Sequence, residues 1–170
     1  MAEWLWAIRP DAQYAYGALL LLAVLWRGDA PERILGATLA GMLGVDQLHH
    51  ALVGGSILWR NANLGHIAID CAVFAVVVPV ALRANRVYPL WIGAAQLIAL
   101  LAHIYRLSLT DINRFAYDVM AVIPSYIQLT AMTLGLGFHM SRRKRLGSYP
   151  SWRSSSSPAR APNPLPPHAR

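Results

Sequence analysis

The stretch from Leu64 to Leu82, LGHIAIDCAVFAVVVPVAL, decides the fold of this chain. It is almost wholly apolar, and as an α-helix it would be about 28 Å long, close to the thickness of the hydrocarbon core of a membrane. Two ionisable residues, His66 and Asp70, interrupt it near its start. The stretch therefore predicts a transmembrane helix with a polar feature at one end.

The composition of the whole chain agrees with a membrane protein. The 170 residues are 56% hydrophobic and only 14% charged, whereas soluble domains carry about 25% charged residues. The formal net charge of +7 does not indicate nucleic-acid binding, because residues 1–140 sum to zero and the excess lies in residues 141–170. We expect the lipid bilayer as the partner, with a membrane protein or a second copy of the chain as further candidates and no nucleic acid.

Five apolar segments, bounded by helix-capping residues, predict an all-α transmembrane bundle. The predicted spans are residues 11–26, 31–53, 64–82, 89–107 and 112–140. The first would be only about 24 Å long, so four spans and an interfacial N-terminal segment are the alternative. Short connections favour antiparallel packing of successive helices. Residues 141–170, rich in Arg, Ser and Pro, are predicted to form a disordered tail.

The basic residues that flank the spans predict the orientation. Eight lie on the side of the tail and four on the other side, which places the tail in the cytoplasm. The eight are Arg27, Arg33, Arg83, Arg86 and the cluster Arg142, Arg143, Lys144 and Arg145, and the four are Arg9, Arg60, Arg106 and Arg114. The cluster is expected to face anionic lipid. Because fourteen Arg stand against one Lys, as in GC-rich bacterial genomes, we predict a multi-pass protein of the bacterial inner membrane with a periplasmic N-terminus.

Ionisable residues inside the spans collect at one depth, although each costs about 2.5–3.5 kcal/mol to insert. In the predicted topology they lie within about 12 Å of the periplasmic boundary, and the inner halves of the spans are almost purely apolar. Helical spacing also places Asp46, His49 and His50 on one stripe. We therefore expect one outward-facing polar site. Its core would be Asp46, His49, His50, Asp70 and His103, surrounded by His66, Gln96, Arg106 and Asp118.

Several uses of this site compete. His and Asp are ordinary ligands of zinc or non-haem iron, and a b-type haem held by His103 with His49 or His50 ranks behind them. Carboxylate and imidazole groups can also relay protons. The leading hypothesis is a small inner-membrane protein that binds a metal or relays protons. The alternative is a non-catalytic accessory or scaffold subunit of a larger membrane complex, and an intramembrane metallohydrolase comes third. No catalytic residue is assigned, and the sequence does not decide whether the protein is an enzyme.

The segment from His66 to Arg145 also resembles a group of small bacterial multi-pass integral membrane proteins. The resemblance is carried by Asp70, the run Arg86–Trp91 (RVYPLW), Gln96, His103 and the pair Ser125-Tyr126. These proteins carry no assigned activity, cofactor or partner. The resemblance therefore implies a bundle of membrane helices and no particular chemistry.

Overall fold

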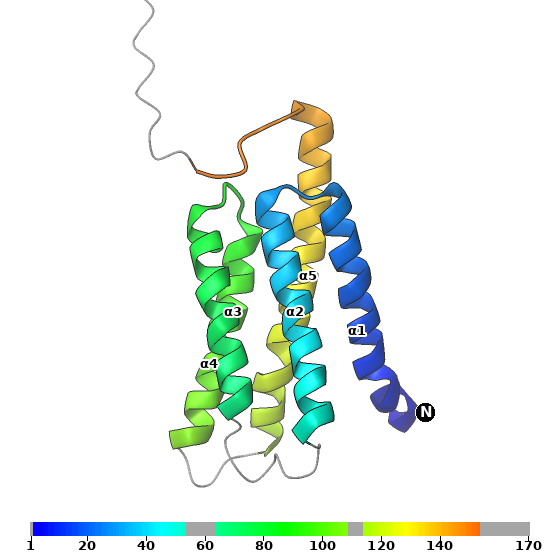
Figure 1. The fold of residues 1–170 in the computed structure, drawn as a ribbon, viewed down its shortest axis with the longest axis vertical. Helices are drawn as coiled ribbons and strands as arrows, with labels where there is room; N and C mark the ends of the chain where they lie inside the picture. Colours follow the sequence, from blue (N-terminus) through cyan, green and yellow to red (C-terminus); the bar gives the residue numbers. More distant parts are fainter. Residues whose placement is uncertain (1, 54–63, 109–113, 154–170) are drawn as a thin grey trace, which may run out of the picture.

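The computed structural model describes residues 2–53, 64–108 and 114–153, and within these ranges the side chains of residues 2–11, 50, 53, 114–118 and 121 are not described. The described residues form five α-helices and no strand. The helices are α1 (Ala2–Arg27), α2 (Ala30–Val53), α3 (Leu64–Arg83), α4 (Tyr88–Ser108) and α5 (Arg114–Leu146). Figure 1 shows them side by side along one long axis, with successive helices antiparallel. The predicted all-α fold is confirmed for this part of the chain.

The start of α2 shows how local sequence builds the bundle. Asp29 precedes the helix and Glu32 lies in its first turn, and the Glu32 carboxylate accepts a hydrogen bond from the Asp29 backbone N–H at 3.1 Å. This is one half of a capping box, and Pro31 suits the first turn because its missing N–H would have no helical partner there. Only Gly28 and Asp29 separate α1 from α2. The connection is so short that the two helices must pack antiparallel.

The packing places α2 and α5 at the centre of the bundle. α2 contacts α1, α3 and α5, and α5 contacts α1, α2 and α4. Apolar side chains from four helices belong to one buried cluster and are 2% exposed or less: Leu35 and Leu39 from α2, Val77 from α3, Ile92 from α4 and Met132 from α5. They form one continuous apolar layer across the interior.

Two of the described helices, α3 and α4, are long and apolar enough to cross a membrane. The other three do not meet the same standard of length and hydropathy over their described residues. Polar residues lower their hydropathy, as Glu32 and Asp46 do in α2 and the basic last turn does in α5. The prediction of five spans is therefore confirmed only as five helices, and the number of spans stays a prediction.

Both ends of the chain depart from the predicted boundaries. α1 begins at Ala2 and not near residue 11. α5 continues through Arg142–Arg145 to Leu146, and residues 147–153 then cross the end of the bundle to the turn between α3 and α4 (Figure 1). The predicted disorder is therefore wrong for residues 141–153, because buried polar groups of the bundle hold this segment in place. Residues 154–170 lie outside the described part.

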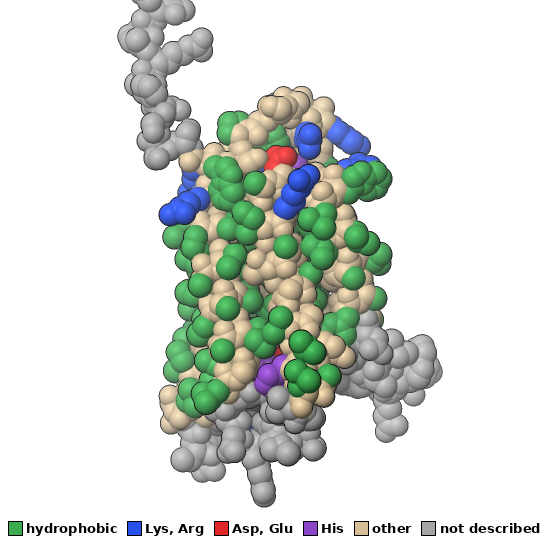
Figure 2. Space-filling model, in the orientation of Figure 1, with side chains coloured by type: hydrophobic (Ala, Val, Ile, Leu, Met, Phe, Trp, Pro, Cys, Tyr) green, Lys and Arg blue, Asp and Glu red, His purple; other side chains and the backbone are tan. Residues whose placement is uncertain are grey.

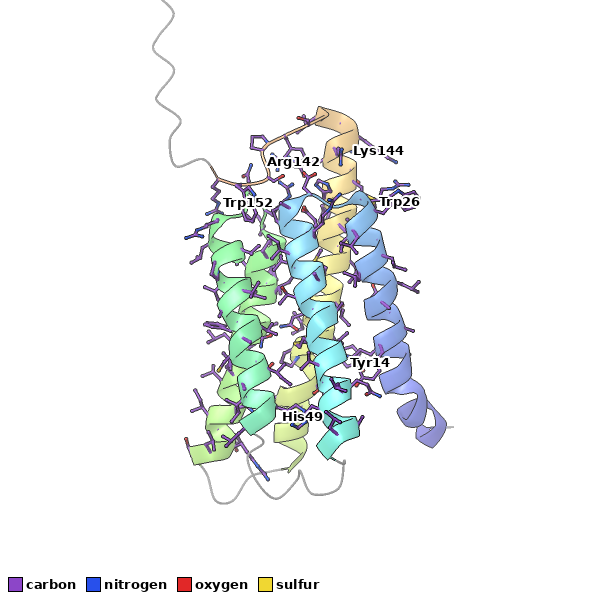
Figure 3. The ribbon with its side chains drawn as sticks, in the orientation of Figure 1. Tyr14, Trp26, His49, Arg142, Lys144 and Trp152 are labelled. Atoms are coloured by element: carbon purple, nitrogen blue, oxygen red, sulfur yellow. The ribbon has the colours of Figure 1, made fainter. Side chains whose placement is uncertain are left out.

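Side chains on the outside of the bundle are arranged in bands. Figure 2 shows hydrophobic side chains over the sides of the molecule and Lys and Arg gathered at the end where α5 emerges. Large apolar side chains such as Leu22 and Trp91, each 64% exposed, contribute to the apolar sides. We call the end with the basic residues the arginine end, and the opposite end, where His49 lies in Figure 3, the histidine end.

A close approach of α4 to α5 provides a test of this packing. A Cβ atom at Gly135 would fall on the ring of Tyr88, far inside van der Waals contact, whereas a Cβ at Gly137 would meet nothing within 4 Å. We predict that Gly135→Ala lowers the free energy of unfolding by about 1–3 kcal/mol through overpacking. Gly137→Ala, the matched control, should be neutral or stabilising by up to about 1 kcal/mol. Unfolding of both variants in detergent micelles measures the difference, and equal effects would contradict this packing.

Candidate functional site

The first polar group at the histidine end joins α2 to α3. Nε2 of His66 lies 2.8 Å from Oδ1 of Asp46, and the two side chains are 25% and 29% exposed. The ring of His49 meets the ring of His66 edge to face, with 4.8 Å between the centroids. Asp46 and His49 are three residues apart on α2, so one helical stripe supplies both contacts to His66.

The second polar group joins α3, α4 and α5. Nε2 of His103 lies 2.8 Å from Oδ2 of Asp70, and the amide of Gln96 donates to the other oxygen of Asp70 at 2.9 Å. The amide of Gln128 in turn donates to Oε1 of Gln96 at 2.6 Å. Both glutamines are 1% exposed. The network therefore holds the Asp70 carboxylate in one orientation, facing the imidazole of His103.

Both groups meet on α3. His66 and Asp70 are one helical turn apart, so the two carboxylate–imidazole pairs are neighbours along one face of that helix. The structure thus brings together Asp46, His49 and His66 in one group and Asp70, Gln96 and His103 in the other. Arg106 lies three residues beyond His103 in the last turn of α4. The side chains of His50 and Asp118 lie outside the described residues.

The described side chains of the histidine end form hydrogen-bonded Asp–His pairs. Among the described side chains, the group of three ligand-bearing residues whose ligand atoms lie within 4.8 Å of one another is at the opposite end of the bundle. Nε2 of His103 already faces a carboxylate oxygen at hydrogen-bond distance. The metal and haem roles suggested for these residues therefore stay predictions, whereas hydrogen-bonded Asp–His pairs are present.

The arginine end contains a buried ion pair. The carboxylate of Glu32 is fully buried, and Nε of Arg86 donates to its Oε1 at 3.0 Å. The hydroxyl of Tyr88 donates to the same oxygen at 3.3 Å. Arg86 also lies 3.5 Å from Oδ2 of Asp29. One guanidinium group therefore links the start of α2 to the turn that precedes α4.

Residues 147–153, which we call the strap, cover this ion pair. Gly147 has φ +71°, a left-handed conformation that lets the chain leave α5 sharply. The backbone N–H of Asn85 donates to the carbonyl of Ser151 at 3.0 Å, and that of Arg153 donates to the carbonyl of Arg83 at 2.8 Å. The hydroxyl of Ser151 donates to Oδ2 of Asp29 at 3.0 Å. The strap is thus fixed at both of its sides.

Tyr149 is the central side chain of the strap. Its ring lies between two guanidinium groups, with the Arg86 and Arg142 carbons 4.3 and 4.4 Å from the ring centroid, a favourable cation–π arrangement. Its hydroxyl lies 2.8 Å from Nδ1 of His139. Burial raises the pKa of the Tyr149 hydroxyl above its ordinary value. The hydroxyl is therefore neutral at physiological pH and can either donate to the imidazole or accept from it.

The arginine end corrects one expectation from the sequence. The inner halves of the helices are not almost purely apolar, because Glu32 of α2 and His139 of α5 are buried there, next to Arg86 from the turn between α3 and α4. The spacing of Asp29 and Glu32, which matches a capping box, was the available signal for a defined structure at this point. His139 is a histidine within an apolar helix, like those at the histidine end. Its partners Tyr149 and Arg86 lie outside α5, so helical spacing does not reveal them.

Comparison of the chain with protein-family models, with curated proteins and with solved structures finds no match.

We predict that the Arg86–Glu32 pair is strongly coupled. Arg86→Met should lower the free energy of unfolding by about 3–5 kcal/mol, because it leaves a buried carboxylate without a counter-charge. The double variant Glu32→Gln, Arg86→Met should recover part of that loss. Arg83→Met, a change of the same type at an exposed side chain, should stay within about 0.5 kcal/mol of the parent. Unfolding by SDS in mixed micelles measures these three variants and the single variant Glu32→Gln. If the effects of the two single substitutions add up to that of the double variant, the pair is not coupled.

Proposed function

We propose that this chain is a small integral membrane protein. The support is threefold: two helices are apolar and long enough to span a bilayer, the sides of the bundle expose large hydrophobic side chains, and basic side chains concentrate at one end (Figure 2). Exposed apolar side chains around a whole bundle are unfavourable in water and favourable in lipid. All five helices would lie in or along the membrane, with the polar ends at its two faces.

The arginine end faces the cytoplasm in this proposal. Its basic residues include Arg27, Arg33, Arg83 and the cluster Arg142, Arg143, Lys144 and Arg145. Cytoplasmic loops of membrane proteins carry an excess of Lys and Arg, and basic residues near an anionic leaflet contribute about 1 kcal/mol each. The histidine end then opens toward the periplasm.

This orientation is testable with reporter fusions. Green fluorescent protein fused after the last residue of the full chain should fluoresce, because it folds in the cytoplasm and not after export through the general secretory pathway. Alkaline phosphatase inserted between residues 53 and 64, at the histidine end, should be active, because it needs the oxidising periplasm. The reverse pattern would invert the proposed orientation.

We propose further that the histidine end takes up and passes protons. The observation that carries this proposal is the pair of Asp–His contacts at 2.8 Å, Asp46 with His66 and Asp70 with His103, on neighbouring turns of α3. An imidazole hydrogen-bonded to a carboxylate can bind a proton on one nitrogen and release it from the other. Within each pair, a proton would move only the length of one hydrogen bond between the carboxylate and the imidazole.

The relay would be open to one side only. On α4, Ile92 lies between Gln96 and Tyr88, and it belongs to one buried apolar cluster with Met132 of α5 and Val77 of α3. Eight residues from Tyr88 to Gln96 correspond to about 12 Å of helix. This apolar layer would prevent protons from crossing to the arginine end, so the relay would serve a reaction or a partner in the outer half of the membrane.

An accessory or scaffold subunit is the second candidate, and one observation favours it. The network from Gln128 through Gln96 to Asp70 joins three helices, and both of its glutamines are buried. Hydrogen bonds between transmembrane helices stabilise bundles by about 0.6 kcal/mol on average. A network of this kind can therefore serve to hold α3, α4 and α5 together without any transfer of protons.

Infrared difference spectroscopy on sealed proteoliposomes distinguishes the two candidates. When the pH of the medium facing the histidine end is lowered, a relay should give carboxyl protonation bands that disappear in the Asp46→Asn and Asp70→Asn variants. His103→Asn should shift the band of Asp70, because it changes the partner of that carboxylate. Asp29→Asn, a matched change at the arginine end, should leave these bands unchanged.

The opposite result has a clear meaning. If bands of Asp46 and Asp70 do not respond to the pH on that side, while the same substitutions lower the unfolding temperature, the pairs are structural. The accessory-subunit candidate would then replace the relay.

A further inference from the structure

One nitrogen at the arginine end has no hydrogen-bond partner among the described residues. It is Nε2 of His139, in a side chain with no exposed surface. Nδ1 of the same ring lies 2.8 Å from the Tyr149 hydroxyl and 3.3 Å from Nη2 of Arg86. A buried polar atom without a partner costs free energy. A ligand bound to Nε2 would remove this cost.

Carboxylates surround this imidazole. Nε2 of His139 faces Oδ2 of Asp29 at 3.9 Å, and Nδ1 lies 3.9 Å from Oε1 of Glu32. One ligand atom from each of these three residues lies within 4.8 Å of the other two. Ligand atoms around a tetrahedral zinc ion, each about 2.0–2.2 Å from the metal, are separated by about 3.4 Å. A distance of 3.9 Å is thus slightly longer than a metal-bound pair needs and too long for a hydrogen bond.

The two carboxylates differ in how tightly they are held. Both oxygens of Glu32 are engaged, one by Arg86 and Tyr88 and the other by the Asp29 backbone. Asp29 is 29% exposed at its side chain, and the guanidinium of Arg143, 3.7 Å away, is 59% exposed. The buried guanidinium of Arg86 is therefore shared between Glu32 and Oδ2 of Asp29, which lies 3.5 Å from its Nη2. The second positive charge beside Asp29, on Arg143, lies on a side chain that can move into solvent.

Space for further ligands lies next to Asp29. A cavity of about 210 Å³ is lined by Asp29, Arg143, Gly147, Ser148, Tyr149 and Ser151. It is bounded by the strap on one side and by the bundle on the other. Its polar lining and its volume admit several water molecules.

We propose that Nε2 of His139 and the carboxylate of Asp29 bind a divalent transition-metal cation of the zinc type at the arginine end. Glu32 stays paired with Arg86 and adds negative charge nearby, and water in the cavity completes the coordination. The imidazole must then carry its proton on Nδ1 and donate it to the Tyr149 hydroxyl at 2.8 Å. Such a bond to the second nitrogen is the usual way in which proteins orient a metal-binding histidine. Because a guanidinium can only donate, the 3.3 Å contact of Nη2 of Arg86 with Nδ1 would have to open when the metal binds.

Binding would also act on the strap. Asp29 now accepts the hydroxyl of Ser151 and lies near Arg143, and a cation on its carboxylate would compete with both contacts. The site therefore couples the metal to the segment that covers it. This site lies at the opposite end of the bundle from the Asp–His pairs, and its success or failure is independent of the proposed proton relay.

Calorimetric titration of the purified full-length chain with zinc chloride in detergent tests the proposal. We expect one saturable site, with affinity at least tenfold weaker in His139→Asn and in Asp29→Asn. The matched control is His66→Asn, which removes an imidazole at the histidine end and should leave the affinity unchanged. Absence of binding to the parent, or loss of binding in His66→Asn but not in His139→Asn, would overturn the proposal.

A variant that is expected to bind zinc more tightly distinguishes loss of a ligand from loss of the folded structure. Arg143→Gln removes the positive charge beside Asp29 from an exposed side chain, so zinc should bind more tightly, by about threefold or more. A gain of affinity cannot arise from loss of structure. Unchanged or weaker binding in Arg143→Gln would show that Asp29 is not a ligand.

Discussion

The ion pair between Glu32 and Arg86 is the interaction on which the arginine end depends. A carboxylate with no exposed surface is costly unless its charge is balanced and its oxygens accept hydrogen bonds. Arg86, Tyr88 and the Asp29 backbone satisfy it together. These partners come from the start of α2 and from the region where α4 begins. The pair therefore sets how these elements meet, and Tyr88, held by Glu32, packs in turn on Gly135 of α5.

The two ends of the bundle use polar groups in different ways. At the histidine end the charges belong to Asp–His pairs that are partly exposed and whose groups can change protonation. At the arginine end a permanently charged guanidinium is buried against a carboxylate, and the strap excludes solvent from it. The first arrangement is the basis of the proposed proton relay. The second arrangement holds Glu32 and Arg86 in fixed positions, whereas the carboxylate of Asp29 is partly exposed and can change its contacts.

Much of the fold follows from the sequence, whereas the partners of individual side chains do not. Apolar length and capping residues predicted all five helices, with the bounds of α2, α3 and α4 within one residue. Helical spacing placed His66 and Asp70 on one face, but each pairs with a residue of a different helix and not with the other. That choice depends on how α2 and α4 are rotated about their axes, which periodicity within a single helix does not determine. The strap escaped prediction for the same reason, because its order depends on contacts with Asp29 and His139.

The path of the strap moves the point from which the chain leaves the bundle. α5 ends at Leu146, but the backbone of Arg153 is bound to Arg83 at the end of α3. The described part of the chain therefore ends above α3 and α4, on the other side of the arginine end from α1 (Figure 1). The seven residues of the strap thus carry the chain from the end of α5 to the end of α3. A protein domain attached to this chain would have its reach measured from the turn between α3 and α4.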